Sequence, residues 1–163
     1  MISSTAPMKI QTLAILCLAL ACGTAVSREL HSYALVQEDA SLQIKGKRVH
    51  LYGIYLPDTG RHCRSNIRPV WCASRAALAL DFRIQGFVHC YPQTKNADNS
   101  LNAICYVDRG PFDDGKDLAA YLLEQGWALA LPDAPFDYHA LERIARHNHR
   151  GVWGFPVDSV TRH

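Results

Sequence analysis

The chain has 163 residues, of which 48% are hydrophobic and 20% charged, and its formal net charge at pH 7 is +2. This length and composition suit one domain with a substantial core. A net charge so close to zero excludes a strong overall attraction to polyanions, so any nucleic-acid contact must come from a local patch.

The N-terminal segment, residues 1–27, is predicted to be a secretory signal peptide. Lys9 precedes an apolar run from Leu13 to Ala21, and Ala25-Val26-Ser27 provides the small residues of a cleavage site. The apolar run is too short to span a bilayer. Cleavage would remove one positive charge, that of Lys9, and lower the net charge from +2 to +1.

Cys22 raises the alternative of a lipoprotein, because it follows Leu20-Ala21 near the end of the apolar run. Ala19, however, occupies the position where a lipoprotein signal usually has leucine. The sequence therefore favours export of residues 28–163 to a bacterial periplasm or exterior over lipidation. A retained N-terminal anchor is the other alternative.

Four cysteines remain after the predicted cleavage, namely Cys63, Cys72, Cys90 and Cys105. In an oxidising compartment an even count predicts two disulfides, with three possible pairings. Chain order and the strands described below favour Cys63–Cys72 and Cys90–Cys105. Four buried thiols are the alternative, and a zinc site is disfavoured because no pair has CxxC spacing.

The first predicted elements are strands. Residues 33–36 form a short apolar run, and apolar residues then alternate with polar ones through residues 42–51, interrupted by a tight turn at Gly46-Lys47. This pattern predicts a hairpin at the start of a sheet. Residues 57–69 are polar and predict a loop. The loop carries three arginines, Arg61, Arg64 and Arg68.

A helix is predicted after this loop, with a buried face containing Cys72, Ala76 and Leu80, and Gly86 closes it. Two strands follow, the first at residues 87–91 and halted by Pro92, the second at residues 103–107. Each strand carries one cysteine, which suits a cross-strand disulfide.

Two more helices are predicted near the C-terminus. Asp117 caps the first and Gly126 terminates it, while Asp137 caps the second and Gly151 ends it. The residues of the last helix expected to face the core are Tyr138, Leu141, Ile144 and Ala145. The same helix carries a basic stripe of Arg143, Arg146 and Arg150, which indicates either an anionic partner or a solvated face.

The stretch Val49-His-Leu-Tyr-Gly-Ile-Tyr-Leu-Pro-Asp58 resembles an active-site strand of the thermonuclease family, also called staphylococcal nuclease-like. The resemblance extends from about Val36 to Phe155. Further matching segments are Trp71-Cys72-Ala73, Val88-His89-Cys90, Ala103-Ile104-Cys105, Asp117 to Ala130, and Tyr138 to Trp153. The resemblance implies a β-barrel plus α-helices, namely a five-stranded OB-fold barrel with three helices spanning residues 28–163.

Members of this family cleave phosphodiesters with calcium held mainly by two aspartates, a glutamate near the attacking water and two arginines on the phosphate. At the corresponding positions this chain has Ala40 and Tyr55 for the aspartates and Asp58 for the glutamate. His50 replaces the first arginine, and Ser100 or its neighbour replaces the second. A hard cation requires carboxylate oxygens, and phosphate requires fixed positive donors. These substitutions therefore predict no bound metal or other cofactor, and calcium is expected only if catalysis persists.

These substitutions favour a protein that has lost nuclease chemistry and acts as a binding module. The expected partner is a polyanion such as single-stranded nucleic acid or acidic polysaccharide, another glycan, or an envelope protein. The candidate binding residues around the former active-site mouth are Tyr55, Arg61, Arg64 and Arg68. The alternative is a divergent phosphodiesterase with a site rebuilt around His50 and Asp58. A purely structural envelope protein is the third possibility.

Overall fold

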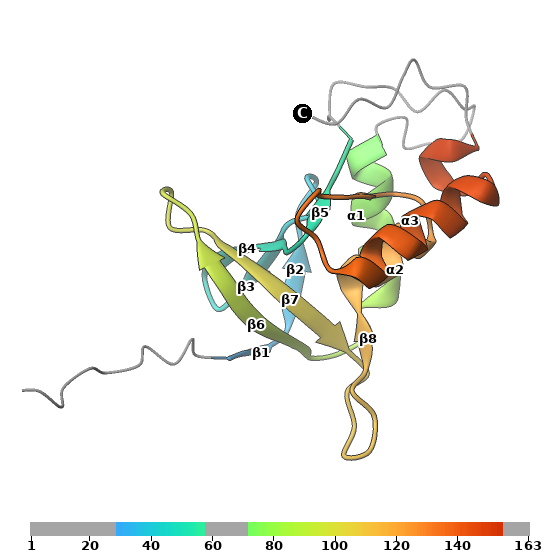
Figure 1. The fold of residues 1–163 in the computed structure, drawn as a ribbon. Coiled ribbons are helices and arrows are strands. Elements are labelled where there is room, and N and C mark those ends of the chain that lie inside the picture. Colours follow the sequence, from blue (N-terminus) through green and yellow to red (C-terminus); the bar gives the residue numbers. More distant parts are fainter. Residues whose placement is uncertain (1–28, 58–71, 155–163) are drawn as a thin grey trace, which may run out of the picture.

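The computed structural model describes residues 29–57 and 72–154, and the side chains of the second stretch from residue 75 onward. A curved sheet forms a nearly closed, barrel-like body, and three helices lie together beside it (Figure 1). The helices are α1 (Cys72–Arg83), α2 (Leu118–Glu124) and α3 (Phe136–His147). In the described stretches, none of them combines the length and apolarity that crossing a bilayer requires.

The main sheet has the strand order β1-β6-β7-β4-β3-β2, with β8 added beside β7. Its strands are β1 (Leu30–Ser32), β2 (Ala34–Val36), β3 (Leu42–Ile44), β4 (Lys47–Leu51), β6 (Val88–Lys95), β7 (Leu101–Val107) and β8 (Lys116–Asp117). All pairs are antiparallel except β4 with β7. A separate antiparallel pair joins β5 (Ile54–Tyr55) to β9 (Leu129–Ala130).

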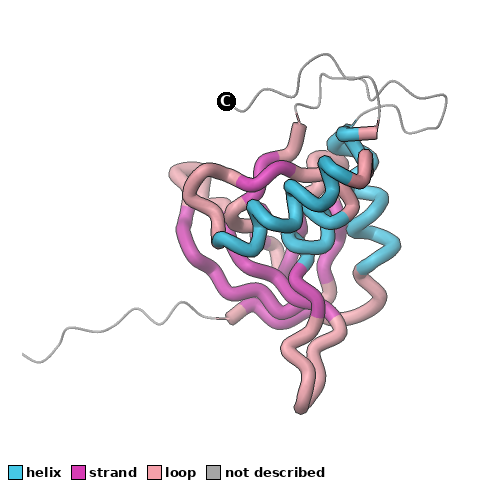
Figure 2. The backbone as a smooth tube through the Cα atoms, turned by 45° about the vertical axis from the view of Figure 1, so that its right-hand side comes forward, coloured by secondary structure: helices cyan, strands magenta, loops and turns pink. Residues whose placement is uncertain are grey.

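A bend at Tyr33 brings the two ends of the main sheet together. Tyr33 alone separates β1 from β2, yet β1 pairs with β6 and β2 pairs with β3. One short segment therefore contributes to both ends of the strand order, which gives the sheet its barrel-like form (Figure 2). The predicted barrel with helices is confirmed at this level.

The β3–β4 hairpin follows the predicted alternation, with Val49 and its neighbours Leu42, Ile44 and Leu51 buried in the core. Its turn lies one residue earlier than the predicted Gly46-Lys47. The turn residues are Lys45 and Gly46, with φ values of 48° and 76°. Two residues at positive φ match the twist of the flanking strands, which explains the tight connection.

β6 is longer than predicted, because it continues through Pro92 to Lys95. The pairing of β6 with β7 shifts between Pro92 and Thr94. On its other side, β6 pairs with β1 only from Val88 to Cys90. Because β1 does not reach Pro92, the missing proline amide costs no hydrogen bond on that side of β6, and the strand continues through Pro92.

The predicted Cys90–Cys105 disulfide is confirmed. The two cysteines are direct partners in the β6–β7 register, their Cα atoms are 4.1 Å apart, and both are fully buried. The predicted partner bridge, Cys63–Cys72, lies outside the described residues.

α2 begins as predicted at Asp117, whose carboxylate accepts hydrogen bonds from the backbone amides of Ala119 and Ala120. The hydroxyl of Tyr138 also donates to Asp117, at 2.5 Å. Burial, together with Asp117, raises the pKa of Tyr138. One carboxylate thus caps α2 and joins it to α3.

α3 differs from its prediction at both ends. It begins at Phe136 after Pro135, so Asp137 lies in its first turn rather than at the cap, and it ends at His147 rather than at Gly151. Ile144 is 53% exposed, contrary to expectation. The buried face of α3 instead includes Glu142, whose carboxylate accepts a hydrogen bond from the amide of Ala130 at 2.8 Å.

Candidate functional site

The β2–β3 connection is a tight turn stabilised by the Asp39 side chain. Its backbone is closed by a hydrogen bond of 2.8 Å from the amide of Gln37 to the carbonyl of Ser41. The Asp39 carboxylate accepts from the amide and the hydroxyl of Ser41, at 3.0 and 2.6 Å. Ala40, between them, has a φ of 59° and is almost fully buried.

The β6–β7 connection has the same construction. The amide of Asn96 donates to the carbonyl of Ser100 at 2.9 Å, and Asn99 has a φ of 68°. The Asp98 carboxylate accepts from the amide and the hydroxyl of Ser100, at 3.0 and 2.7 Å. The Asn96 side chain also donates to the Ser100 hydroxyl, at 2.8 Å. In both turns, therefore, the carboxylate of an aspartate accepts hydrogen bonds from the serine two residues later in an Asp-x-Ser sequence.

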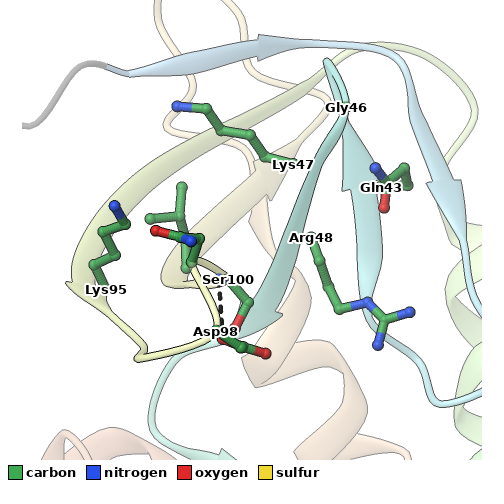
Figure 3. A pocket seen from close by; sticks show the side chains of 9 residues that line it. Gln43, Gly46, Lys47, Arg48, Lys95, Asp98 and Ser100 are labelled. Atoms are coloured by element: carbon green, nitrogen blue, oxygen red, sulfur yellow. Dashed lines mark hydrogen bonds between the residues drawn. The ribbon is translucent and has the colours of Figure 1, made fainter.

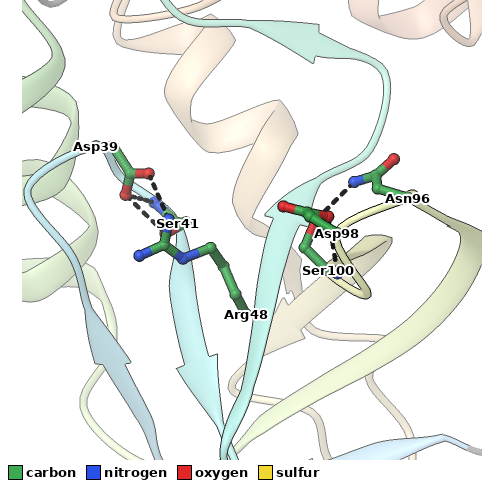
Figure 4. Close-up of polar contacts among 6 residues, drawn as sticks. All are labelled: Asp39, Ser41, Arg48, Asn96, Asp98 and Ser100. Atoms are coloured by element: carbon green, nitrogen blue, oxygen red, sulfur yellow. Dashed lines mark hydrogen bonds and ion pairs between the residues drawn. The ribbon is translucent and has the colours of Figure 1, made fainter.

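The two turns lie on either side of β4, with the Arg48 side chain directed toward Asp39 (Figure 4). The closest atoms of Arg48 and Asp39 are 3.9 Å apart. Burial raises the pKa of Asp39, but the Ser41 hydrogen bonds and the charges of Arg48 and His50 outweigh it and lower the pKa overall. The Ser100 hydrogen bonds lower the pKa of Asp98, and His50 contributes as well. His50 therefore lies within electrostatic reach of both carboxylates.

The lowered pKa of Asp39 predicts a specific response to acid. The charged carboxylate stabilises the fold above its ordinary pKa of 3.8, and this stabilisation is lost as the pH falls through the lower folded-state value. Asp39→Asn should reduce the free energy of unfolding at pH 7 by at most about 1 kcal/mol, because the side chain is partly solvated. Urea unfolding at pH 7 and pH 3 should show a smaller difference between the two proteins at pH 3. Glu38→Gln controls for the loss of one negative charge, and a constant difference at both pH values would contradict the prediction.

An open groove of about 590 Å³ lies between the β3–β4 turn and the β6–β7 turn (Figure 3). Three cationic side chains line it, those of Lys47, Arg48 and Lys95, together with the single carboxylate of Asp98. The remaining lining residues are Gln43, Gly46, Asn99, Ser100 and Leu101. Arg48 is directed toward Asp39, at 3.9 Å, so Lys47 and Lys95 are the cations set against Asp98. The positive charges still exceed the negative ones, and the groove therefore suits an anionic ligand.

Among the predicted site residues within the described ranges, the structure joins Cys90 to Cys105 and places His50 and Tyr55 on different strands. His50 lies on β4, half-buried, and pairs in register with Asn102 of β7. Tyr55 lies on β5 and pairs with Leu129. Five predicted residues, Asp58, Arg61, Cys63, Arg64 and Arg68, lie outside the described residues, as does the side chain of Cys72.

The two positions at which the resemblance implies calcium ligands supply no carboxylate. Ala40 contributes only a buried methyl group, and Tyr55 contributes a phenol. Within residues 29–57 and 72–154, no three His, Cys, Asp or Glu side chains are grouped so that they could hold a metal ion. The described residues therefore do not fit the calcium site of the thermonuclease family.

The groove cations were not among the predicted site residues. Lys47 and Arg48 are ordinary charged residues of a hairpin, and Lys95 lies almost fifty residues later. Their proximity depends on the parallel pairing of β4 with β7, which a local pattern does not reveal. The repeated Asp-x-Ser of residues 39–41 and 98–100 is the one sequence signal that marks both turns.

No family model and no curated protein matches this chain. Over residues 29–57 and 72–154, the fold is a barrel-like sheet with three α-helices and a cross-strand disulfide.

Proposed function

We propose that this chain is an exported, thermonuclease-like protein of the OB-fold type that binds a polyanion without hydrolysing it. The strand order supports the OB-fold assignment. With β1 and β2 counted as one bent strand, and the two-residue β8 set aside as an addition beside β7, the main sheet has five strands in a closing order. α1 lies in the chain between β4 and β6. OB-fold barrels bind oligonucleotides and oligosaccharides through their loops and one face.

The observation that carries the binding function is the groove with Lys47, Arg48 and Lys95 around it. Loss of catalysis is supported by Ala40 and Tyr55, which replace the carboxylates that the resemblance assigns to calcium. The imidazole of His50 also lacks the parallel pair of donors with which the guanidinium that the resemblance implies there would bind a phosphate.

Binding should be tested by fluorescence anisotropy with a labelled 15-nucleotide poly-dT strand and, in competition, with heparin, across a series of salt concentrations. The triple variant Lys47→Gln/Arg48→Gln/Lys95→Gln should bind dT at least tenfold more weakly. Its slope of log affinity against log salt should be shallower by about 2, since each lost phosphate contact on a single strand removes about 0.7. The single variant Lys95→Gln should also bind more weakly, and Lys116→Gln, which removes a cation on β8 paired with Glu124 at 2.7 Å, is its charge-matched control.

The same protein should be incubated with labelled single-stranded DNA and RNA in calcium, magnesium, manganese and EDTA. If the protein cleaves either substrate and His50→Ala abolishes the cleavage, its function is that of a divergent phosphodiesterase and not of a binding module. Affinity for neither dT nor heparin would reject the polyanion and leave an uncharged glycan or an envelope protein as the ligand.

A further inference from the structure

The loop between β7 and β8 projects from the body as a narrow finger, residues 108–115 (Figures 1 and 2). Its tip is the turn Gly110-Pro111-Phe112-Asp113, in which Gly110 and Asp113 exchange backbone hydrogen bonds of 3.0 and 3.4 Å. The Phe112 side chain at the tip is fully exposed. The finger therefore presents a large apolar ring to solvent on a hydrogen-bonded turn.

The finger is held by one contact at its base and by another between its tip turn and its returning arm. Asp108 forms an ion pair of 2.6 Å with Arg83 of α1, and the Asp113 carboxylate accepts from the amide of Gly115 at 2.9 Å. Gly115 has a φ of 81°, and a Cβ there would collide with the carbonyl oxygen of Val107. A fixed backbone lowers the entropy cost of docking the tip, and such aromatic anchors dominate many interfaces.

Asp113 of the tip turn carries a carboxylate next in the chain to Phe112, and Asp114 follows it on the way back to β8. The cation in the same loop, Arg109, lies over the ring of Tyr91 at 5.3 Å, at the base of the finger. The tip is thus apolar and acidic, and it fits a partner surface that combines an apolar hollow with cations.

The outer face of α3 has this complementary chemistry. An open groove of about 360 Å³ runs along it, lined by Phe136, His139, Glu142, Arg143 and Arg146. The Phe136 ring is 76% exposed, and Arg143 and Arg146 are exposed. Glu142 is buried and directs its carboxylate to the amide of Ala130, so the rim of the groove is cationic. Arg146 also lies over the ring of Trp153, at 4.9 Å.

We propose that the finger of one molecule docks into the α3 groove of a second copy, with Phe112 against Phe136 and the two aspartates facing Arg143 and Arg146. The finger points away from α3 in both views, so one molecule does not fill its own groove (Figures 1 and 2). The contact joins two different surfaces, and it therefore builds head-to-tail chains or rings rather than a closed two-fold dimer. It is independent of the proposed polyanion groove.

The test is sedimentation velocity of the purified protein over a range of concentrations. The contact is small, so we expect weak association, with a dissociation constant on the order of 100 μM and species larger than a dimer at higher concentration. Phe112→Ala and Arg143→Glu should each weaken self-association at least about tenfold. Phe82→Ala is the control, because Phe82 is an exposed aromatic residue of α1 outside both surfaces. Circular dichroism melts check that every variant is folded.

Mixing the two variants distinguishes this contact from any other. The Arg143→Glu protein keeps its finger and the Phe112→Ala protein keeps its groove, so the mixture should form a 1:1 complex and nothing larger. A wild-type protein that remains monomeric up to about 1 mM would overturn the proposal. Unchanged association of either variant, or failure of the mixture to form a complex, would overturn it too.

Discussion

Replacing both cysteines of the buried disulfide, in Cys90→Ala/Cys105→Ala, should lower the free energy of unfolding by about 3 kcal/mol. The bridge closes a loop with a sequence separation of 15 residues, and the chain-entropy estimate for such a loop is about 3 kcal/mol. Both cysteines are fully buried in the core, so loss of sulfur packing adds to the effect. Urea unfolding of the oxidised wild type and of the double variant measures the difference.

A Cys63→Ala/Cys72→Ala background gives the matched control, because its reduction breaks only the Cys90–Cys105 bond and retains both sulfur atoms. The reduced background protein should lie in stability between its oxidised form and the variant that also carries Cys90→Ala/Cys105→Ala. If the double variant unfolds at the same urea concentration as the oxidised wild type, the disulfide does not contribute to stability and the prediction is wrong.

Gly151→Ala should destabilise the protein by about 2–4 kcal/mol. Gly151 has a φ of 56°, a left-handed conformation that costs an alanine about 1–2 kcal/mol. A Cβ there would also collide with the carbonyl of Gly126, whose oxygen already accepts a hydrogen bond from Val152 at 2.9 Å, and such overpacking typically costs about 1–3 kcal/mol. Thermal unfolding of the variant should show a lower midpoint.

Gly86→Ala is the matched control for this substitution. Gly86 lies just after α1, its φ is not in the left-handed region, and a Cβ there would meet nothing within 4 Å. Its replacement should change the stability by no more than about 1 kcal/mol. Equal losses from Gly86→Ala and Gly151→Ala would show that the close approach of Gly126 and Gly151 is not the cause.

The elements that sequence reasoning located correctly are those with a local physical cause. Asp117 was predicted to cap α2 because an aspartate before an apolar helical face accepts the free amides of a first turn. The cross-strand disulfide followed from two cysteines on neighbouring strands. In α3 the local signals were misleading, since Pro135 precedes the first turn and the buried carboxylate of Glu142 takes a core position through a partner twelve residues away.

The candidate site was less accessible to sequence reasoning, because it depends on contacts between distant segments. The resemblance points to His50, whose charge helps to lower the pKa of Asp39 and of Asp98. Lys95 joins Lys47 and Arg48 only because the start of β7 lies beside the start of β4. Of the α3 groove, the sequence indicates only the basic stripe of Arg143, Arg146 and Arg150. No pattern in the sequence marks Asp113 as an acidic residue that would meet this stripe.

Because of the bend at Tyr33, the strand that closes the barrel against β6 is β1, at the start of the described residues. β1 begins at Leu30, and its three residues are the only ones in the described stretches that pair with β6 along the side opposite β7. Shortening the chain by a few residues there would leave the backbone amides and carbonyls of residues 88–90 without their strand partner. An exposed strand edge of that kind recruits other chains. The position chosen for an N-terminal tag, or for the start of a recombinant fragment, therefore determines whether this edge of β6 is covered.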